Sequence, residues 1–257
     1  MTGHLPLPRA ALVTGAGRRI GRAIALALAA DGFAVAVHHR AAQADAAEVV
    51  RAIEAVGGRA VALGADLAAE DETAALVGRA ADALGPLGCL VNSASVFERD
   101  EALTATRESW DRHLTVNLRA PFVLTQQFAR ALPAAAEGVV VNLLDERVWS
   151  LTPHFVSYTV SKSALWTLTR TLALALAPRV RVNGIGPGPT LPSPRQSEEQ
   201  FARQRASVPL GRGPALDEIP AAVRFILAAR SMTGQMIALD GGQHLQWSPA
   251  GRSEIEE

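Results

Sequence analysis

Short apolar runs alternate with helical patterns along most of the chain. Runs such as "AALV" at 10–13 are apolar almost throughout, which is typical of strands buried on both faces. Segments such as "RIGRAIALALAADG" at 19–32 instead place apolar residues at helical spacing and end in Gly. The predicted strands cover 10–13, 33–39, 59–67, 87–95, 138–145, 179–188 and 234–242. The predicted helices cover 19–32, 45–58, 70–85, 107–131, 156–177 and 215–229.

This alternation predicts an α/β fold: a single Rossmann-type doubly wound domain with a parallel sheet of about seven strands between helices. No linker-like break divides residues 1–257, and we expect flexible ends at 1–8 and 248–257. One Pro- and Ser-rich segment departs from the alternation, within residues 186–207. It follows the carboxyl end of a predicted strand, where open α/β sheets bind ligands. We predict a substrate lid there, and a plain surface loop is the alternative.

Composition narrows the class of protein. The chain is 49% hydrophobic and 19% charged, with a formal net charge of zero. These values indicate a globular protein and argue against nucleic acid or an anionic membrane as a partner. No apolar run reaches the roughly 20 residues of a membrane span, and the N-terminus lacks the apolar core of a signal peptide. The single cysteine, Cys89, cannot form an internal disulfide, so we expect a cytoplasmic protein, and no metal site is predicted.

Two residue types are almost absent from the chain. Tyr158 is the only tyrosine, and Lys162 is the only lysine among 25 Lys and Arg residues. They lie four positions apart on a predicted helix, so both lie on one face. A nearby ammonium stabilises a phenolate and lowers the pKa of the phenol toward the range useful in catalysis. Arg cannot supply the same compact charge and Phe has no proton to give, so the pair predicts acid–base chemistry.

A glycine-rich turn, "TGAGRRIG", follows the first predicted strand at residues 14–21. Such a turn lets backbone N–H groups and a helix N-terminus approach a pyrophosphate. The turn supplies the candidate cofactor contacts Gly15, Arg18, Arg19, Ile20 and Gly21. Arg19 stands where a dinucleotide fingerprint has its middle glycine. We expect it to contact a phosphate or to reach into the cleft, and an exposed arginine at the helix start is the alternative.

The second predicted strand ends in His38, His39 and Arg40, without the acidic residue that binds the ribose of NAD. Arg18 on the neighbouring turn adds a further positive charge. This basic cluster suits a 2′-phosphate, which favours NADPH over NADH. The alternative is a solvated basic strand end.

Over essentially its whole length, the chain resembles the short-chain dehydrogenase/reductase family. The matching motifs are "TGAGRRIG", "ADL" at 65–67, "NSA" at 92–94, Asn117 in "TVNL", "YTVSK" and "GPGPT". The resemblance implies cofactor contacts from three turns: Asp66 and Leu67 beside the adenine, Asn92, Ser93 and Ala94 along the floor, and Pro187 and Gly188 around the nicotinamide. It also implies that Asn117 supports a proton relay to Lys162, and that the protein is a homotetramer.

One position departs from the family pattern. The family usually has a serine 13 positions before the tyrosine, and here that position is Asp145. An ionised carboxylate cannot donate a hydrogen bond to a carbonyl oxygen. It can accept one from an N–H group of a nitrogen heterocycle and help Tyr158 pass a proton to a ring nitrogen. Pairing with Arg147 or capping of a turn is the alternative role for Asp145.

Two further residues resemble the pteridine reductase branch of that family, which includes the dihydromonapterin reductases. They are Arg19 and Phe97. In that branch the phenylalanine stacks the pterin against the nicotinamide, the serine that matches Ser95 touches the ligand, and the arginine contacts pterin and phosphate. Phe97 as an ordinary buried side chain is the alternative. Trp149, His154 and Phe155 lie in a segment without an assignable motif, where they line the pocket or simply pack.

These observations predict an NADPH-dependent reductase whose small-molecule substrate is a pterin. The reaction is reduction of a C=N bond of a dihydropterin such as dihydromonapterin or dihydrobiopterin, or of dihydrofolate. The first alternative is a carbonyl or 3-oxoacyl reductase of the same family. A second alternative is a non-catalytic nucleotide-sensing module, because a fold does not fix a function.

Overall fold

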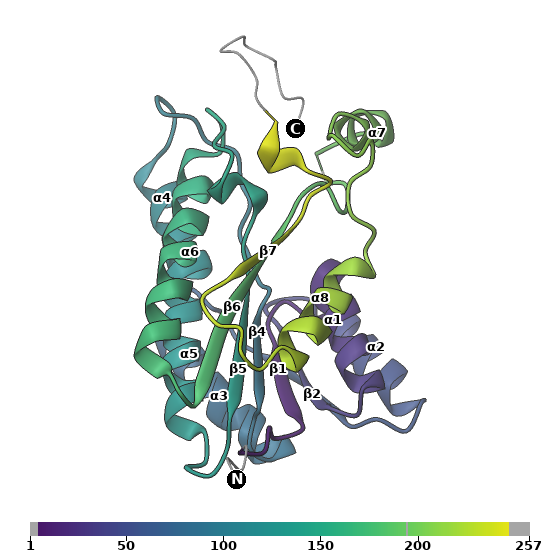
Figure 1. Ribbon diagram of the computed structural model, residues 1–257, viewed down its shortest axis with the longest axis vertical. Coiled ribbons are helices and arrows are strands. Elements are labelled where there is room, and N and C mark those ends of the chain that lie inside the picture. The colour runs from purple at the N-terminus through teal and green to yellow at the C-terminus, as the bar shows by residue number, and fades with distance from the viewer. Residues whose placement is uncertain (1–4, 194, 247–257) are drawn as a thin grey trace.

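The computed structural model describes residues 5–193 and 195–246, and within them the chain forms a seven-stranded parallel sheet (Figure 1). The strand order is β3-β2-β1-β4-β5-β6-β7. The prediction of a single doubly wound α/β sheet is confirmed. The strands are β1 (Ala10–Val13), β2 (Ala34–His39), β3 (Ala60–Gly64), β4 (Cys89–Asn92), β5 (Gly138–Leu143), β6 (Val180–Pro187) and β7 (Met236–Leu239).

Helices cover both faces of the sheet (Figure 1). One face packs against α1 (Arg19–Ala30), α2 (Gln43–Glu54) and α8 (Glu218–Ala228). The other packs against α3 (Glu70–Leu84), α5 (Ala120–Ala131) and α6 (Val156–Leu176). Side chains alternate between the two cores, as in β1, where Ala11 and Val13 face one layer while Ala10 and Leu12 face the other. Burial on both faces explains why the strands are continuously apolar.

The helix expected over 107–131 is divided into α4 (Arg107–Leu114), a π-helical turn η1 (Thr115–Arg119) and α5. Asn117 lies within the π turn, and its amide group bonds the backbone N–H and C=O of Val96 at 2.7 and 2.9 Å. Single π turns often mark functional positions in a helix. Hydrophobic spacing alone does not reveal this interruption, because both flanking segments keep the helical period.

The predicted lid contains a helix that the sequence pattern did not indicate, α7 (Glu198–Ala206). Ser197 and Gln200 form a capping box at its start. Short 3₁₀ turns also lie near the carboxyl ends of the strands, η2 (Glu146–Val148) and η3 (Gln243–Leu245). Together with α7 they stand at the upper end of the molecule in Figure 1. The expected flexible ends lie outside the described residues, apart from residues 5–8.

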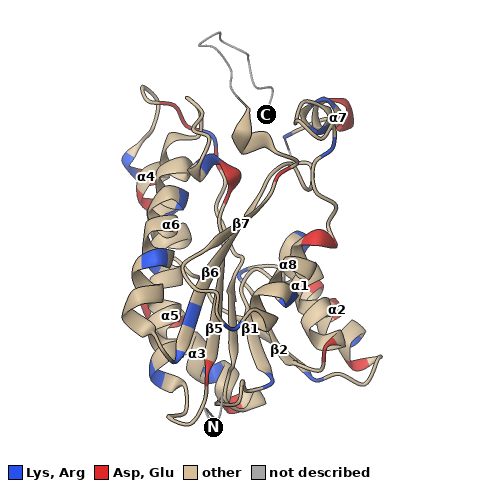
Figure 2. Ribbon diagram, viewed as in Figure 1, with Lys and Arg blue, Asp and Glu red and all other residues tan. Residues whose placement is uncertain are grey.

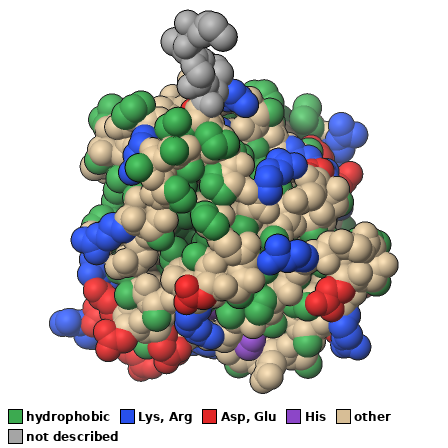
Figure 3. Space-filling view, turned by 90° about the horizontal axis from the view of Figure 1, so that it is seen from below, with side chains coloured by type: hydrophobic (Ala, Val, Ile, Leu, Met, Phe, Trp, Pro, Cys, Tyr) green, Lys and Arg blue, Asp and Glu red, His purple; other side chains and the backbone are tan. Residues whose placement is uncertain are grey.

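The surface shows both signs of charge. Arginines and carboxylates lie on the outer helices (Figure 2), and both occur on the face seen from below (Figure 3). This mixture agrees with the formal net charge of zero. Within residues 5–193 and 195–246, none of the helices is both long enough and apolar enough to cross a membrane.

Candidate active site

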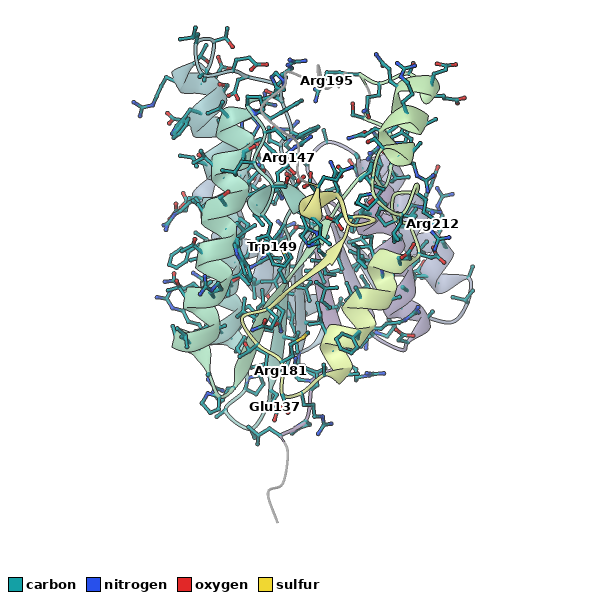
Figure 4. The ribbon with its side chains drawn as sticks, turned by 45° about the horizontal axis from the view of Figure 1, so that its top comes forward. Glu137, Arg147, Trp149, Arg181, Arg195 and Arg212 are labelled. Carbon is teal, nitrogen blue, oxygen red and sulfur yellow. The ribbon has the colours of Figure 1, made fainter. Side chains whose placement is uncertain are left out.

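A pocket of about 230 Å³ opens at the carboxyl ends of the central strands. Its walls come from the glycine-rich turn, the segment after β4, the end of β5, the start of α6 and the predicted lid. Figure 4 shows Arg147 and Arg195 at this end of the molecule, between the two helical layers. The predicted site residues that line the pocket are Arg19, Ile20, Ser93, Ser95, Phe97, Asp145, Tyr158, Lys162, Pro187 and Gly188.

Asp145 and Tyr158 are joined directly. The Tyr158 hydroxyl donates to Asp145 Oδ2 at 2.7 Å. Asp145 Oδ1 accepts from the backbone N–H of Arg147 at 2.9 Å, which caps η2. The turn-capping role and the contact with tyrosine therefore occur together, on different oxygens of one carboxylate. Because the cap fixes the rotamer of Asp145, the oxygen that meets the phenol is held in place.

Lys162 lies beneath this pair, and it is 3% exposed. Its Nζ donates to the carbonyl oxygen of Leu143 at 2.7 Å and lies 5.7 Å from the centre of the Tyr158 ring. Burial lowers the pKa of Lys162 to about 8, against the opposing effect of the Asp145 charge. The ammonium is therefore close to its titration range at neutral pH, within reach of the phenol.

The hydrogen bonds described for the Asn117 side chain go to residues other than Lys162. Besides Val96, its Nδ2 donates to Ser161 Oγ at 3.1 Å, and its Oδ1 accepts from Ser95 Oγ at 3.2 Å. The side chain thus ties the segment after β4 to helix α6, one residue before the lysine. The relay to Lys162 that the resemblance implies remains a prediction.

Phe97 belongs to an aromatic wall. Its ring stacks on Phe155 with 4.6 Å between centroids and an interplanar angle of 7°. Tyr158 meets it edge-on at 4.7 Å. The guanidinium groups of Arg147 and Arg195 lie 5.4 and 5.5 Å from its centre. Phe97 lines the pocket as predicted, and Phe155, which the sequence left unassigned, packs behind it.

The glycine-rich turn is closely packed at both of its ends. Gly15 has φ 63°, and a Cβ at this position would come within 3.0 Å of the Cα of Ala94. A Cβ on Gly21 would lie 2.3 Å from the carbonyl oxygen of Gly15. Only glycine fits such contacts, so these two glycines let the turn pack tightly against Ala94 and against itself.

Arg19 takes a backbone conformation that favours glycine, with φ 54°. Its side chain reaches across to the segment predicted as a lid and donates to the carbonyl oxygens of Leu191 and Pro192, at 3.3 and 2.8 Å. Burial lowers the pKa of its guanidinium. Of the two expected roles, the structure shows the arginine reaching into the cleft.

His38 does not carry the charge expected of it. The ring is 1% exposed, its Nδ1 accepts from the N–H of Gly15 at 3.1 Å, and its Nε2 faces the carbonyl oxygen of Ala65 at 3.0 Å. Burial lowers the pKa of His38 to about 4, so the imidazole is neutral at pH 7. The expectation of a positive His38 is therefore wrong. The residue instead fastens the glycine turn to β2 and β3.

The other members of the basic cluster differ from His38. Arg18 and Arg40 are exposed, and Arg18 pairs with Asp45 at 2.5 Å. His39 is buried against Gly64, and its Nδ1 lacks a hydrogen-bond partner among the described residues. The exposed positive charge beside the second strand therefore comes from the two arginines.

The remaining predicted contacts line the same edge of the sheet. Asp66 caps the turn after β3 through the N–H of Ala68, and Leu67 is buried. Asn92 donates to the side chain of Asn142 at 2.8 Å, which links β4 to β5. Ser93 and Ala94 follow Asn92, and Pro187 and Gly188 end β6.

Thr14 was missed by the sequence analysis. Its Oγ1 accepts from the backbone N–H groups of Ser93 and Ala94, at 2.9 and 3.0 Å. It thereby holds the turn after β4 against the glycine-rich turn. The available signal was its place as the first residue of "TGAGRRIG". Three pocket-lining glutamines, Gln196, Gln204 and Gln243, were also missed, because no motif marks them.

The comparisons with known proteins agree with this geometry. A family model described as short chain dehydrogenase matches residues 9–203. L-xylulose reductase from Bos taurus is 38% identical over 243 residues, which cover 91% of this chain and 96% of that protein.

Solved structures are similar as well. FolM alternative dihydrofolate reductase 1 from Brucella canis, complexed with NADP, is 47% identical with a TM-score of 0.93 and covers 98% of this chain and 100% of its own. A short chain dehydrogenase from Burkholderia cenocepacia, also with NADP, is 35% identical with a TM-score of 0.85 and covers 94% and 99%. The expected family is confirmed: this chain belongs to the short-chain dehydrogenase family of oxidoreductases.

Proposed function

We propose that the protein is an NADPH-dependent reductase that reduces a C=N bond of a pterin. The observation that carries the proposal is the hydrogen bond from Tyr158 to Asp145, inside a pocket walled by Phe97. It combines a proton donor, a hydrogen-bond acceptor for ring N–H groups and an aromatic surface. These three features suit the binding and protonation of a flat nitrogen heterocycle.

The cofactor end of the site fits a dinucleotide. Gly15 and Gly21 form the tight turn between β1 and helix α1, and the N-terminus of that helix suits a pyrophosphate. Arg18 and Arg40 supply charge for a 2′-phosphate, and the two similar structures described above contain NADP. When bound, NADPH supplies hydride to the substrate carbon. The nicotinamide side of the site is expected near Pro187 and Gly188.

The protein's own residues handle the proton. Tyr158 gives its hydroxyl proton to the ring nitrogen next to the reduced carbon. The Lys162 ammonium stabilises the phenolate that remains. Asp145 holds the phenol in place before transfer and accepts a hydrogen bond from a ring N–H group of the substrate. Phe97 and the pocket walls hold the ring in position, which supplies much of the rate.

Asp145 also leads us to expect that a ketone is the poorer substrate. Where a serine hydroxyl would donate to a carbonyl oxygen, a carboxylate offers lone pairs and negative charge to a developing oxyanion. The name of the Brucella canis protein, a dihydrofolate reductase, supports a pterin, because a folate contains a pterin ring. The L-xylulose reductase relative keeps carbonyl reduction as the second candidate.

The test is NADPH oxidation with dihydromonapterin, dihydrobiopterin, dihydrofolate, L-xylulose and a 3-oxoacyl thioester. We expect turnover of at least one pterin by the native protein. Asp145→Ser should reduce pterin turnover and increase ketone turnover. Efficient ketone reduction by the native protein without pterin reduction would contradict the proposal. Absence of turnover on every substrate, with NADPH still bound, would favour a nucleotide-sensing module.

A further inference from the structure

Helix α6 carries Tyr158 in its first turn, yet the helix starts without a cap of its own. The N-cap residue is Phe155, whose side chain makes no capping hydrogen bond. Its φ of 57° lies in the left-handed region, which is costly for a bulky residue. The first N–H groups of a helix have no partner within it. Another part of the chain must therefore hold this start in place.

Asp100, from the segment between β4 and α4, supplies the missing acceptors. Its backbone oxygen accepts from the N–H of Val156 at 3.3 Å, and its Oδ1 accepts from the N–H of Ser157 at 3.1 Å. Its Oδ2 accepts from the hydroxyl of Ser157. Asp100 is thus an N-cap that reaches the helix from 57 residues away. A carboxylate is the preferred group at this end of a helix, because the helix dipole is positive there.

The same carboxylate is tied to α4. Asp100 Oδ2 also accepts from the Ser109 hydroxyl at 2.9 Å. His113, which is fully buried, places its Nδ1 2.7 Å from the Ser157 hydroxyl, and its Nε2 accepts from the N–H of Glu98 at 3.1 Å. The network therefore fixes the backbone next to Phe97 as well as the start of α6.

The carboxylate is buried but remains ionised. Asp100 is 5% exposed, and burial acts to raise its pKa. Hydrogen bonds from Ser157 and Ser109, and the proximity of His113, outweigh that effect and hold the pKa of Asp100 below its usual value. At neutral pH the cap therefore keeps its full accepting capacity.

Two aromatic contacts depend on this arrangement. Phe155 and Tyr158 both stand at the start of α6, and Phe97 meets them at centroid distances of 4.6 and 4.7 Å. A shift of the helix start would move the proton donor relative to the wall that receives the substrate ring. A misplacement of about 1 Å at a reacting centre can cost on the order of 10²-fold in rate.

We propose that Asp100 is a positioning residue that sets Tyr158 against Phe97 by capping helix α6 from outside. The proposal rests on the proton-donor role given to Tyr158 under the proposed function. Asp100 is not among the residues that line the pocket, and it would act through the start of α6 and through its bond to Ser109 of α4. It is therefore expected to affect the chemical step while leaving cofactor binding intact.

The test compares Asp100→Ala with Asp100→Asn, which keeps an acceptor for the N–H of Ser157. With dihydrobiopterin as substrate, Asp100→Ala should lower kcat by about tenfold or more, with the KM for NADPH changed by less than about twofold. Asp100→Asn should recover most of kcat. The control is Thr73→Ala, which removes the hydroxyl of a buried threonine in α3 bonded to Ala69. It should lower Tm without lowering kcat.

A second measurement needs no substrate. Tyr158 is the only tyrosine, so the ultraviolet absorbance of phenolate follows its ionisation alone. The titration midpoint should move in Asp100→Ala and return toward the native value in Asp100→Asn. If Asp100→Ala does not fold, Ser157→Ala removes one hydrogen bond from Asp100 and should move kcat and the midpoint in the same directions, by less.

The outcomes separate the two proposals. Native kcat and a native titration midpoint in Asp100→Ala, with only a lower Tm, would make Asp100 a purely structural cap and overturn the inference. If the native protein does not reduce dihydrobiopterin or other pterins, the proposed function fails, and the phenolate titration still decides the role of Asp100. If Tyr158→Phe keeps native turnover, the proton-donor assignment fails, whatever Asp100 does.

Discussion

The two ends of the site, at one edge of the sheet, are built differently. At the proton-donor end, Tyr158 and Lys162 are buried and each bonds a fixed partner in the chain. At the phosphate end, Arg18 and Arg40 are exposed, while the neighbouring His38 is buried and neutral. Proton transfer depends on atoms fixed in advance, whereas a phosphate can be met by cations that reorient when it binds. The contrast predicts that changes at the first end act on kcat and changes at the second act on KM.

The largest expected effect is that of Tyr158→Phe. Loss of the proton donor should lower kcat by about 10²- to 10⁴-fold, the usual contribution of a positioned acid or base. Binding of NADPH should be nearly unchanged, because the phenyl ring keeps its contacts with Phe97. Steady-state kinetics and NADPH fluorescence titration measure the two quantities. A variant that retained native kcat would remove the basis for calling this end catalytic.

The pH dependence sharpens the assignment of Lys162. Its pKa of about 8 predicts that kcat/KM of the free enzyme falls above pH 8, by about tenfold per pH unit, as the ammonium that stabilises the phenolate is lost.

The effect of this lysine on stability should have the opposite sign. Below about pH 8 both folded and unfolded chains hold the proton of Lys162. From there to about 10.4, the unfolded chain binds more protons, so the free energy of unfolding rises with pH. Thermal melts of the native protein and Lys162→Met should diverge over that range. If Tm depends on pH equally in the two proteins, and the activity of the native protein stays constant up to pH 10, the lowered pKa of Lys162 is contradicted.

The smallest expected effect is at the phosphate end. Arg40→Ala should raise the KM for NADPH about tenfold, the equivalent of one charge-assisted hydrogen bond, and leave the KM for NADH and kcat nearly unchanged. Arg51→Ala, at an exposed position on α2, is the matched control, because it also removes one arginine. A fall in kcat in Arg40→Ala would break the contrast between the two ends.

Much of the site follows from short-range features of the chain. The strand and helix periods indicated a parallel sheet, and in a parallel sheet the carboxyl ends of β1, β4, β5 and β6 lie at one edge. The tyrosine and the lysine were identified by their spacing and Asp145 by the family resemblance, and all three line one pocket. The basic cluster was identified by residue type alone, and its charge was therefore overestimated at His38.

The sequence by itself determined the layered fold and the candidate groups for chemistry, because both depend on residue type and local periodicity. Tertiary structure decided the rest: the neutral state of His38, the π turn at Asn117, the reach of Arg19 to Leu191 and Pro192, and the cap that Asp100 provides. Each depends on hydrogen bonds or burial between segments far apart in the chain. Such contacts leave no local period in the sequence, since they are fixed only when the strands and helices pack.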